Sequence, residues 1–394
     1  MTRPRLILLG VTRHTVEEAV RLGARVVVID TPAFISILDP PEGTTAIADA
    51  GYLARSPESI VAMARAALGG ADACLTLTEV AMALSAEVNA VLGVPDNSPD
   101  AVAATIDKAV MRARLAAAPE LGTEWARAGD PRAFTEFLAG RDGSWIAKPV
   151  AGSGSIGVAR CHDGAPAPAG GYPYLIEREL SGTEFSVESF SQDGQHSVIG
   201  CTTSEPGPRG APDEFAQYGH LFPMAADPAQ AAAVRRAVGL LLDTLGVRQG
   251  LTHTEIMLTA EGPRVIETHV RHGGGKILDL VHAALGIDMV RLAVAARLGH
   301  DPAAYLEPGW QRVAAVRFFQ VRPGTVTRYA GVARAARIPG VIRLEFPWHL
   351  GDRISRQDAV THRPGYVLVA AGTQQEAERA LDAVEAEIEW SVRP

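Results

Sequence analysis

The chain begins with apolar and polar positions that switch between a strand pattern and a helix pattern. An apolar run at 5–10 precedes an amphipathic stretch at 14–23, and a second apolar run occupies 24–30. A helix between two apolar strands within about 25 residues is a βαβ unit, which requires a parallel sheet. The pattern therefore predicts an α/β fold that opens with a Rossmann-like domain, which we place at residues 1–98.

The same alternation continues within this domain, with helices expected at 57–68 and 79–91 and a strand near 72–77. Gly10 is the only glycine in the first strand–helix turn, so the dinucleotide-binding pattern G-x-G-x-x-G is absent. This absence argues against a dehydrogenase that binds a nicotinamide cofactor on the N-terminal unit. We therefore expect the domain to have a Rossmann-like fold but not the glycine pattern that binds a dinucleotide.

The rest of the chain mixes helical and strand patterns. Ser98 and Pro99 provide an N-cap and a first helical residue, so we expect one long helix over 99–118. The other expected elements are, in chain order, a helix at 131–140, strands at 144–150, 174–180 and 181–191, and helices at 228–245, 276–299 and 373–390.

Composition and charge narrow the classes of protein to which the chain can belong. Hydrophobic residues make up 47% and charged residues 21% of the 394 residues, as in ordinary globular proteins. The formal net charge of −8 argues against nucleic acid as a partner, since phosphate binding normally needs a basic surface. The three cysteines lie far apart, and the sequence has neither a long apolar run nor a secretory pattern. We expect a cytoplasmic protein without membrane contact.

The most informative segment is THTEIMLTAEGPRVIETHVRHGGG, at 252–275. Alternating residues fit two strands, and the Gly-Pro pair at 262–263 fits the turn between them. The register that we expect pairs Leu258 with Arg264 around a loop at 259–263.

This register places Glu255 opposite Glu267, and His253 opposite His269, all on one side of the hairpin. Two opposed carboxylates repel each other unless a cation lies between them, and carboxylate oxygens suit magnesium. The segment therefore predicts a divalent-metal platform. The alternative is a half-exposed hairpin whose acidic residues face water.

A glycine-rich loop follows the strand expected at 144–150. Its sequence from Lys148 is Lys-Pro-Val-Ala-Gly-Ser-Gly-Ser-Ile-Gly, and such glycines let backbone N–H groups approach phosphate oxygens. Lys148 would add a positive charge for the same phosphates. No Gly-Lys-Ser/Thr opens a helix here, so this is not a Walker loop. A glycine-rich turn without a ligand is the alternative, but the metal platform downstream favours a nucleotide site.

Two further segments could serve a nucleotide. Lys108 lies in the expected long helix as a second candidate cation, with a solvated helix lysine as the alternative. Residues Glu177–Glu184 form a strand end, a link and a new strand, whose backbone groups can meet an adenine edge. The carboxylate of Glu184 could accept hydrogen bonds from ribose hydroxyls. Without the other motifs, these would be surface acids.

Three motifs, in this order, resemble the ATP-grasp superfamily. They are the lysine and glycine loop at 148–157, Ile-Glu-Arg-Glu-Leu-Ser-Gly-Thr-Glu at 176–184, and Thr-Glu-Ile…Glu-Thr-His-Val-Arg…Gly-Gly at 254–274. The chain is similar to the carboxylate–amine ligases, especially the dipeptide-forming L-amino-acid ligases. The resemblance implies an ATP-grasp fold with a Rossmann-like first domain and a C-terminal β-rich and α lobe. It further implies an ATP-grasp domain at 99–300, with lobes at 107–172 and 173–300, and a C-terminal domain at 301–394.

The resemblance also implies roles for individual residues in holding ATP and magnesium. Phosphates would lie against Lys108, Lys148 and the loop residues Ser153, Ser155, Ile156 and Gly157. Adenine would be bordered by Glu177, Arg178, Glu179 and Leu180, and Glu184 would bind the ribose. Glu255 and Glu267 would carry Mg²⁺, with Mn²⁺ as an alternative.

Further residues would serve the reacting acyl group. Arg271 occupies the position where the family has an arginine against the acyl phosphate. The resemblance makes Arg271, Lys148 and Gly274 catalytic, with Gly273 beside them. His269 stands where many relatives have asparagine, so its role as a third metal ligand is open, and His253 with His269 could instead favour zinc or manganese.

The segment 202–223 resembles the substrate-side loop of the amino-acid ligases. Tyr218 and His220 would then line an amino-acid pocket together with His253, Arg271, Gly273 and Gly274. An ordinary surface loop is the alternative.

The function implied is ATP-dependent ligation of a carboxylate to an amine through an acyl phosphate, which releases ADP and phosphate. The substrates would be small amino acids, joined through an α- or a γ-glutamyl-type carboxylate, and the protein would be a homodimer. The alternatives are a carboxylation- or formylation-type ATP-grasp reaction and a nucleotide-binding regulator without catalysis.

Overall fold

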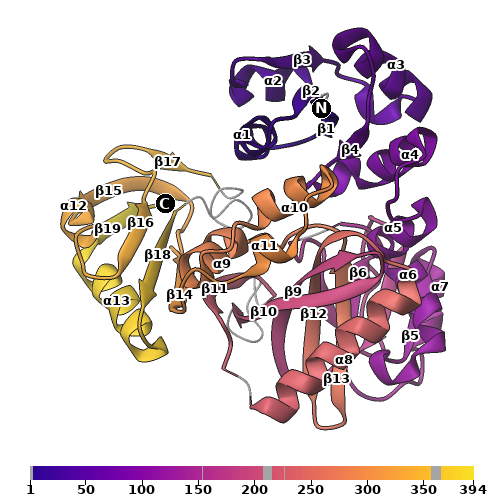
Figure 1. Cartoon of the computed structure of the whole chain (residues 1–394). Coiled ribbons are helices and arrows are strands. Elements are labelled where there is room, and N and C mark those ends of the chain that lie inside the picture. Colours follow the sequence, from indigo (N-terminus) through magenta and orange to yellow (C-terminus); the bar gives the residue numbers. More distant parts are fainter. Residues whose placement is uncertain (1–2, 153, 207–214, 226, 356–364) are drawn as a thin grey trace.

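A computed structural model of the chain describes residues 3–152, 154–206, 215–225, 227–355 and 365–394 (Figure 1). The N-terminal part forms a four-stranded parallel sheet in the order β3-β2-β1-β4. The predicted βαβ unit is confirmed, and so are the helices expected at 57–68 and 79–91. Its elements are β1 (Arg5–Leu9), α1 (Arg13–Arg21), β2 (Arg25–Asp30), α2 (Pro32–Leu38), β3 (Thr44–Ala48), α3 (Pro57–Leu68), β4 (Ala73–Leu75), a 3-10 turn η2 (Glu79–Ala81) and α4 (Met82–Leu92).

The single long helix expected over 99–118 is wrong. Asp107 leaves the helical conformation with φ −94° and ψ 109°, and its carboxylate accepts hydrogen bonds from the N–H groups of Ala109 and Val110. This cap starts a new helix, because an Asp side chain satisfies N–H groups that the first turn leaves free. The segment therefore consists of α5 (Pro99–Ile106) and α6 (Lys108–Arg114), and Lys108 becomes the first residue of α6.

A small antiparallel sheet follows, in the order β5-β8-β6-β7. Its apolar face packs under α7 through Phe134, Trp145 and Ile176. The sheet carries Lys148 near the end of a central strand and leads into the glycine loop. Its elements are β5 (Trp125–Ala128), α7 (Pro131–Leu138), β6 (Trp145–Pro149), β7 (Ala159–Cys161) and β8 (Tyr174–Arg178).

The largest sheet has the order β13-β12-β9-β10-β11-β14-β18-β16. Helix α8 covers one face, where Phe185, Val187 and Ile256 pack against Leu241. The sheet contains strands from both sides of residue 300, and the division of the chain at 98 and 300 remains a proposal. Its strands and helix are β9 (Thr183–Gln192), β10 (Gln195–Pro206), β11 (Gln217–Phe222), α8 (Pro228–Leu245), β12 (Gly250–Thr259), β13 (Gly262–His269), β14 (Val313–Phe318), β16 (Val341–Glu345) and β18 (Tyr366–Ala371).

Two other expectations need correction. The helix expected at 276–299 is broken at Gly286, which has a φ of +75°, so that α9 (Ile277–Leu285) ends there and α10 (Met289–Arg297) starts after Asp288. The segment 202–223 is not a plain loop, because its ends belong to β10 and β11, which pair antiparallel. Residues 207–214 between them lie outside the described part of the chain.

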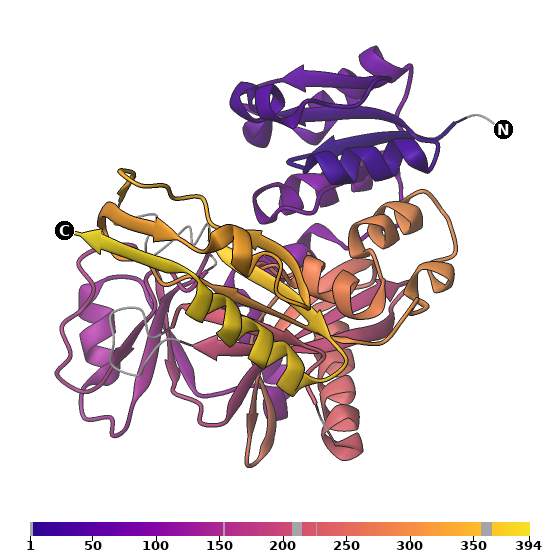
Figure 2. The same ribbon diagram turned by 90° about the vertical axis from the view of Figure 1, so that its left-hand side faces the viewer.

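The C-terminal part packs α13 against β14 and β18, and the helix lies beside the C-terminal strands in Figures 1 and 2. A three-stranded sheet, β17-β15-β19, completes it. The predicted terminal helix is confirmed, but it ends at Glu387, and the chain continues as a strand. The remaining elements are α11 (Ala303–Leu306), β15 (Gly324–Ala330), α12 (Val332–Ala335), β17 (Arg353–Ile354), α13 (Gln374–Glu387) and β19 (Glu389–Arg393). None of the helices among the described residues is both long and apolar enough to cross a membrane.

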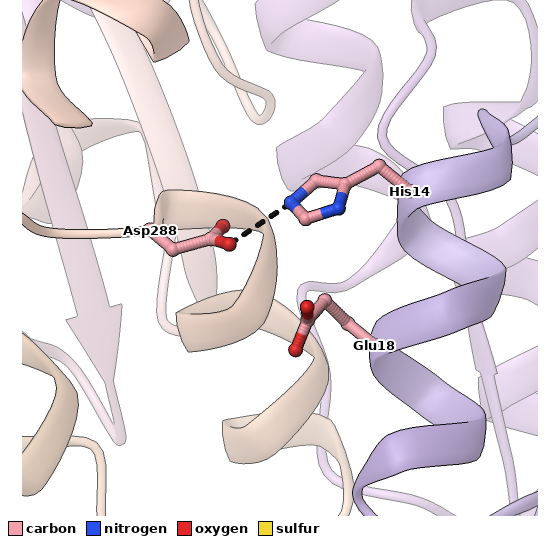
Figure 3. A group of neighbouring side chains, drawn as sticks. All are labelled: His14, Glu18 and Asp288. Carbon is pink, nitrogen blue, oxygen red and sulfur yellow. Dashed lines mark hydrogen bonds and ion pairs between the residues drawn. The ribbon is translucent and has the colours of Figure 1, made fainter. Parts of the chain in front are cut away.

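The N-terminal sheet is joined to the large sheet through the contact between α1 and α10. Their apolar residues share one buried cluster, and a polar cluster lies beside it (Figure 3). His14 Nε2 lies 2.9 Å from Asp288 Oδ2, and the buried Glu18 lies next to them. Arg21 pairs with Glu18, and Arg291 Nε lies 3.8 Å from it. Because arginines already balance Glu18, we interpret the cluster as an interdomain ion-pair network.

Candidate functional site

The β12–β13 hairpin has the carboxylate arrangement that the sequence predicts. Glu255 is directly opposite Glu267, and His253 is opposite His269. The predicted pairing of Leu258 with Arg264 is wrong: Leu258 pairs with Pro263, and the turn spans only the two residues between Thr259 and Gly262. A β-bulge after Glu255 shifts the register by one residue and thereby shortens the turn.

These carboxylates lie at one wall of a cavity of about 220 Å³ between the small sheet and the large sheet. The glycine loop forms the opposite wall. Ser153 lies outside the described residues, and Gly157 is not part of the lining. The cavity brings together twelve residues of interest: Lys108, Arg112, Lys148, Ser155, Ile156, Glu177, Arg178, Glu179, Leu180, Glu184, Glu255 and Glu267.

Lys108 connects the two walls of this cavity. Its Nζ donates to the carbonyl of Gly152 at 2.6 Å and lies 3.0 Å from Glu267 Oε2. The side chain is 7% exposed, and a lysine buried to this degree is nearly always paired. The alternative of a solvated helix lysine is therefore wrong.

The carboxylate of Glu177 is held by two cations. Arg112 Nε and Lys148 Nζ both pair with its carboxylate, and all three side chains are buried. Burial opposes the charged carboxylate, but Arg112 and Lys148 outweigh it and hold the pKa of Glu177 below its ordinary value. The side chain of Glu177 is thus occupied by protein contacts at the cavity wall.

Arg112 was missed by the sequence reasoning, although it lies one helical turn after Lys108 and so on the same face of α6. It also donates to the carbonyl of Ile266 at 3.0 Å, to which Lys148 Nζ donates at 3.3 Å. The guanidinium thereby joins α6, β8 and β13.

The segment after β8 lies at the rim of the cavity. Arg178 Cζ lies 4.9 Å from the centre of the Trp145 ring, and Glu179 pairs with Arg160 at 2.8 Å. These side chains are occupied by protein contacts, so only backbone groups of 178–180 and the Leu180 side chain would meet a ligand here.

Glu184 lies in a crowded acidic environment. Burial and the neighbouring Glu255 raise the pKa of Glu184 to about 7, although Gln217 donates to its Oε1 at 3.2 Å. The negative charge of Glu267 also contributes to the raised pKa of Glu184. Carboxylate oxygens are the ligands that a hard divalent cation prefers, so the opposed Glu255 and Glu267 fit magnesium.

His269 is almost fully buried, with 1% of its side chain exposed. Its Nε2 lies 3.1 Å from Glu267 Oε1, and its Nδ1 lies 3.7 Å from Glu79 Oε2. The carboxylate of Glu267 has a lowered pKa because His269 and Lys108 outweigh the effect of burial. His269 lies behind Glu267 and is not among the residues that line the cavity.

Arg271 follows the hairpin and meets a residue of the N-terminal part. Its Nη2 lies 2.6 Å and its Nε 3.2 Å from Glu79 Oε2, and its Nη1 donates to the carbonyl of His272 at 2.9 Å. The sequence offered no motif for Glu79, which is 192 positions away.

The glycine run after Arg271 leaves no room for larger residues at two positions, because histidine side chains lie close to its backbone. A Cβ at Gly273 would lie 2.6 Å from His253 Nδ1, and one at Gly275, where φ is +56°, would lie 2.4 Å from His220 Nε2. Buried Glu188, also missed from the sequence, accepts from Gly273 N–H at 3.2 Å and lies 2.5 Å from His253 Nδ1. Burial opposes protonation, but Glu188 raises the pKa of His253 to about 10.

Tyr218 lies apart from this group. It lines a second cavity with Arg317, Phe319 and Trp390, whereas His220 lies against the glycine run. The expected substrate residues are therefore brought together, with the exception of Tyr218.

Comparison with known proteins agrees with this geometry. Residues 317–393 match the family model described as L-amino acid ligase C-terminal domain 2. The uncharacterized protein y4rH of Sinorhizobium fredii is 30% identical over 315 residues, which cover 76% of this chain and 64% of that protein. Dapdiamide A synthase of Enterobacter agglomerans is 26% identical over 292 residues, which cover 68% of this chain and 67% of that enzyme. The chain thus spans less than two thirds of the length of y4rH.

Solved structures share the whole fold. An L-amino acid ligase from Bacillus licheniformis superimposes with a TM-score of 0.80 and 20% identity, over 100% of both chains. The biotin carboxylase domain of the Hydrogenobacter thermophilus 2-oxoglutarate carboxylase, solved with MgADP, gives a TM-score of 0.70 and 14% identity over 100% of this chain and 92% of that one.

The architecture is that of the ATP-grasp ligases. The chain shares the fold of these ligases, and by sequence it is similar to dapdiamide A synthase and, over residues 317–393, to the L-amino acid ligases. The resemblance and the fold class expected from the sequence are both confirmed.

Proposed function

We propose that the protein joins the carboxylate of one amino acid to the amine of another, at the expense of ATP, and releases ADP and phosphate. The observation that carries this proposal is the convergence of Lys108, Lys148, Glu255 and Glu267 on one cavity, with Arg271 just beyond the hairpin. The kinship with dapdiamide A synthase and L-amino acid ligase supports it.

ATP would lie in the cavity between the two sheets. Lys108 and Lys148 would neutralise its phosphates beneath the loop at 152–157, and the backbone of 178–180 would border adenine. The ribose would lie near Glu184. Each of these contacts uses groups that line the cavity, and charge neutralisation is the main contribution that a protein makes to phosphoryl transfer.

Glu255 and Glu267 would hold magnesium, and His269 would orient Glu267 from behind. When bound, the ion would shield the transferring phosphoryl group from the attacking carboxylate. Carboxylate oxygens rather than imidazole face the cavity, which favours Mg²⁺ over zinc and keeps Mn²⁺ as the alternative ion.

The chemistry would proceed in two steps. A carboxylate oxygen of the first substrate attacks the γ-phosphorus, the bond to ADP breaks, and an acyl phosphate forms. The amine of the second substrate, having lost its proton to solvent, attacks the acyl carbon, and phosphate leaves as the amide forms. Arg271 and the N–H group of Gly274 would stabilise the negative oxygen in between, since the N–H of Gly273 already donates to Glu188.

The test measures ADP and phosphate release with pairs of amino acids and detects the product by mass spectrometry. A ligase forms one amide for each ADP. ADP release with bicarbonate or formate, without an amide, would indicate the other ATP-grasp reactions. ATP binding without any ADP release would indicate a regulator. Gel filtration with light scattering would test the expected homodimer.

A further inference from the structure

Another cavity, of about 300 Å³, lies where the N-terminal sheet and α4 meet the large sheet and α10. We call it the junction cavity. Among the described residues it shares no lining residue with the nucleotide cavity, and neither Glu79, Arg271 nor the glycine run lines it. Its apolar walls come from both parts of the chain: Leu75, Leu77, Met82, Phe190, Leu251 and Ala293. A cavity of this size can hold a small molecule.

Polar groups of the junction cavity are bound to the protein itself. Asn97 Nδ2 donates to the carbonyl of Gln249 at 2.8 Å, and Asn97 Oδ1 accepts from the N–H of Gln249 at 2.9 Å. Gln249 Nε2 in turn donates to Asp193 Oδ1 at 2.8 Å. The hydroxyls of Thr76 and Ser85 also donate within the protein. Because a ligand would compete with these bonds, it gains little from polar contacts here.

The two buried charges of the lining neutralise each other. Arg297 Nη2 lies 2.9 Å from Asp96 Oδ1, and both side chains are only 12% exposed. Arg297 Nη1 donates to the carbonyl of Pro95 at 3.2 Å, and Asn89 Nδ2 donates to Asp96. The third charged residue of the lining, Asp193, is exposed to water. A charged ligand would therefore lose its hydration without gaining a buried partner of opposite sign, which is costly.

We infer that the junction cavity is a binding site for a small, uncharged, apolar molecule. Apolar walls favour such a guest over water, and the volume suits an aromatic or branched hydrocarbon of about six to ten carbon atoms. A free amino acid does not fit, because its ammonium and carboxylate groups would meet groups that already bind other parts of the protein. The ligand is thus not a substrate of the proposed ligation, and the site is separate from it.

A bound molecule would hold the two parts of the chain together. Leu77 and Met82 belong to the N-terminal part, whereas Phe190 and Leu251 are paired residues of β9 and β12 in the large sheet. The cavity exists only while these two sets of side chains face each other. A ligand that binds this arrangement alone stabilises it by mass action. The site therefore regulates how firmly the N-terminal sheet is attached to the large sheet.

The test uses toluene as the uncharged probe, with benzoate and benzylamine as charged probes of nearly the same shape. Toluene should raise the melting temperature of the full chain saturably, by about 2 °C, whereas the charged probes should change it by less than about 0.5 °C. Hydrogen exchange should slow at 75–86 and at 249–251 and stay unchanged in α13. A crystal soaked in toluene should show the molecule in the junction cavity.

Two substitutions fill the cavity from different helices. Ala296→Leu in α10 and Ala86→Leu in α4 should each abolish the response to toluene, so that one variant decides if the other fails to fold. Ala383→Leu, at an exposed position of α13, is the matched control and should respond as the wild type does.

Three results would overturn the inference: no response of the wild type to toluene, an equal response to benzoate or benzylamine, or an unchanged response in the filled variants. None of these measurements needs ATP or turnover. The release of ADP with pairs of amino acids therefore tests the ligase function separately, and either proposal can fail while the other stands.

Discussion

The nucleotide side and the acyl side of the site are built differently. On the nucleotide side, cations and carboxylates come from α6, the small sheet and the hairpin, and each lies in or near a recognisable motif. On the side that we propose for the acyl group, Arg271 meets Glu79 from the N-terminal part of the chain, and Gly273 and Gly275 meet His253 and His220 from separate strands. The comparison teaches that the residues we propose for ATP lie in local sequence motifs, whereas the contacts of Arg271 and of the glycine run depend on long-range packing.

The substitution with the largest expected effect is Arg271→Ala, which should affect the acyl side and not the nucleotide side. Loss of one oxyanion-stabilising group should lower kcat by about 10²–10³. The affinity for ATP, measured by calorimetry, should stay within about two-fold of the wild type, since Arg271 does not line the cavity. Arg141→Ala, which breaks an exposed pair with Glu124, is the control. If Arg271→Ala kept the wild-type kcat, Arg271 would have no catalytic role on the acyl side.

The substitution Arg112→Met tests the nucleotide side by removing one of the two cations that pair with Glu177. Removing one partner of a buried ion pair leaves a charge uncompensated, but Lys148 remains on Glu177. We expect a loss of about 2–3 kcal/mol in the free energy of unfolding, measured in urea, together with weaker ATP binding. Arg132→Met, on the exposed face of α7, should change the stability by less than about 0.5 kcal/mol. Unchanged stability of Arg112→Met would contradict its structural role.

The acyl side can be disturbed by a single methyl group. Gly275→Ala should displace His220 and lower stability by about 1–3 kcal/mol. Gly69→Ala, which has a φ of +75° but open space around it, measures the backbone strain alone. Equal losses in the two variants would show that the contact with His220 carries no energy.

The smallest effect concerns the contact between α1 and the residue that caps α10. The hydrogen bond to Asp288 raises the pKa of His14 above 6.5. Its stabilisation is complete below pH 6.5 and disappears as the pH rises through the higher folded value. Because His14 is half exposed, its replacement by Gln should cost at most about 0.5 kcal/mol at low pH and nothing at a pH of about 9. Urea titrations across this range, with His162→Gln as the control, would reveal it. A loss that does not change with pH would contradict the ion pair.

Local patterns along the chain determined most of the elements and the nucleotide side. Helix α8 follows from the periodicity of its apolar residues, and the opposition of Glu255 to Glu267 follows from the pairing of two strands in a hairpin. Both depend on residues that are close in the sequence. The expected helices over 99–118 and 276–299 were too long because a capping Asp107 and a left-handed Gly286 interrupt patterns that remain apolar throughout.

Only the tertiary structure decided the contacts of the acyl side and the place of Arg112 on the nucleotide side. Arg112 with Glu177, Glu188 with His253, and Glu79 with Arg271 are pairs of residues 65 or more positions apart. A buried charge selects its partner in three dimensions, because the cost of desolvation must be met by whichever group the packing brings close. The motifs of this chain thus predict the proposed nucleotide side, and the docking of the N-terminal sheet determines what lies beside Arg271.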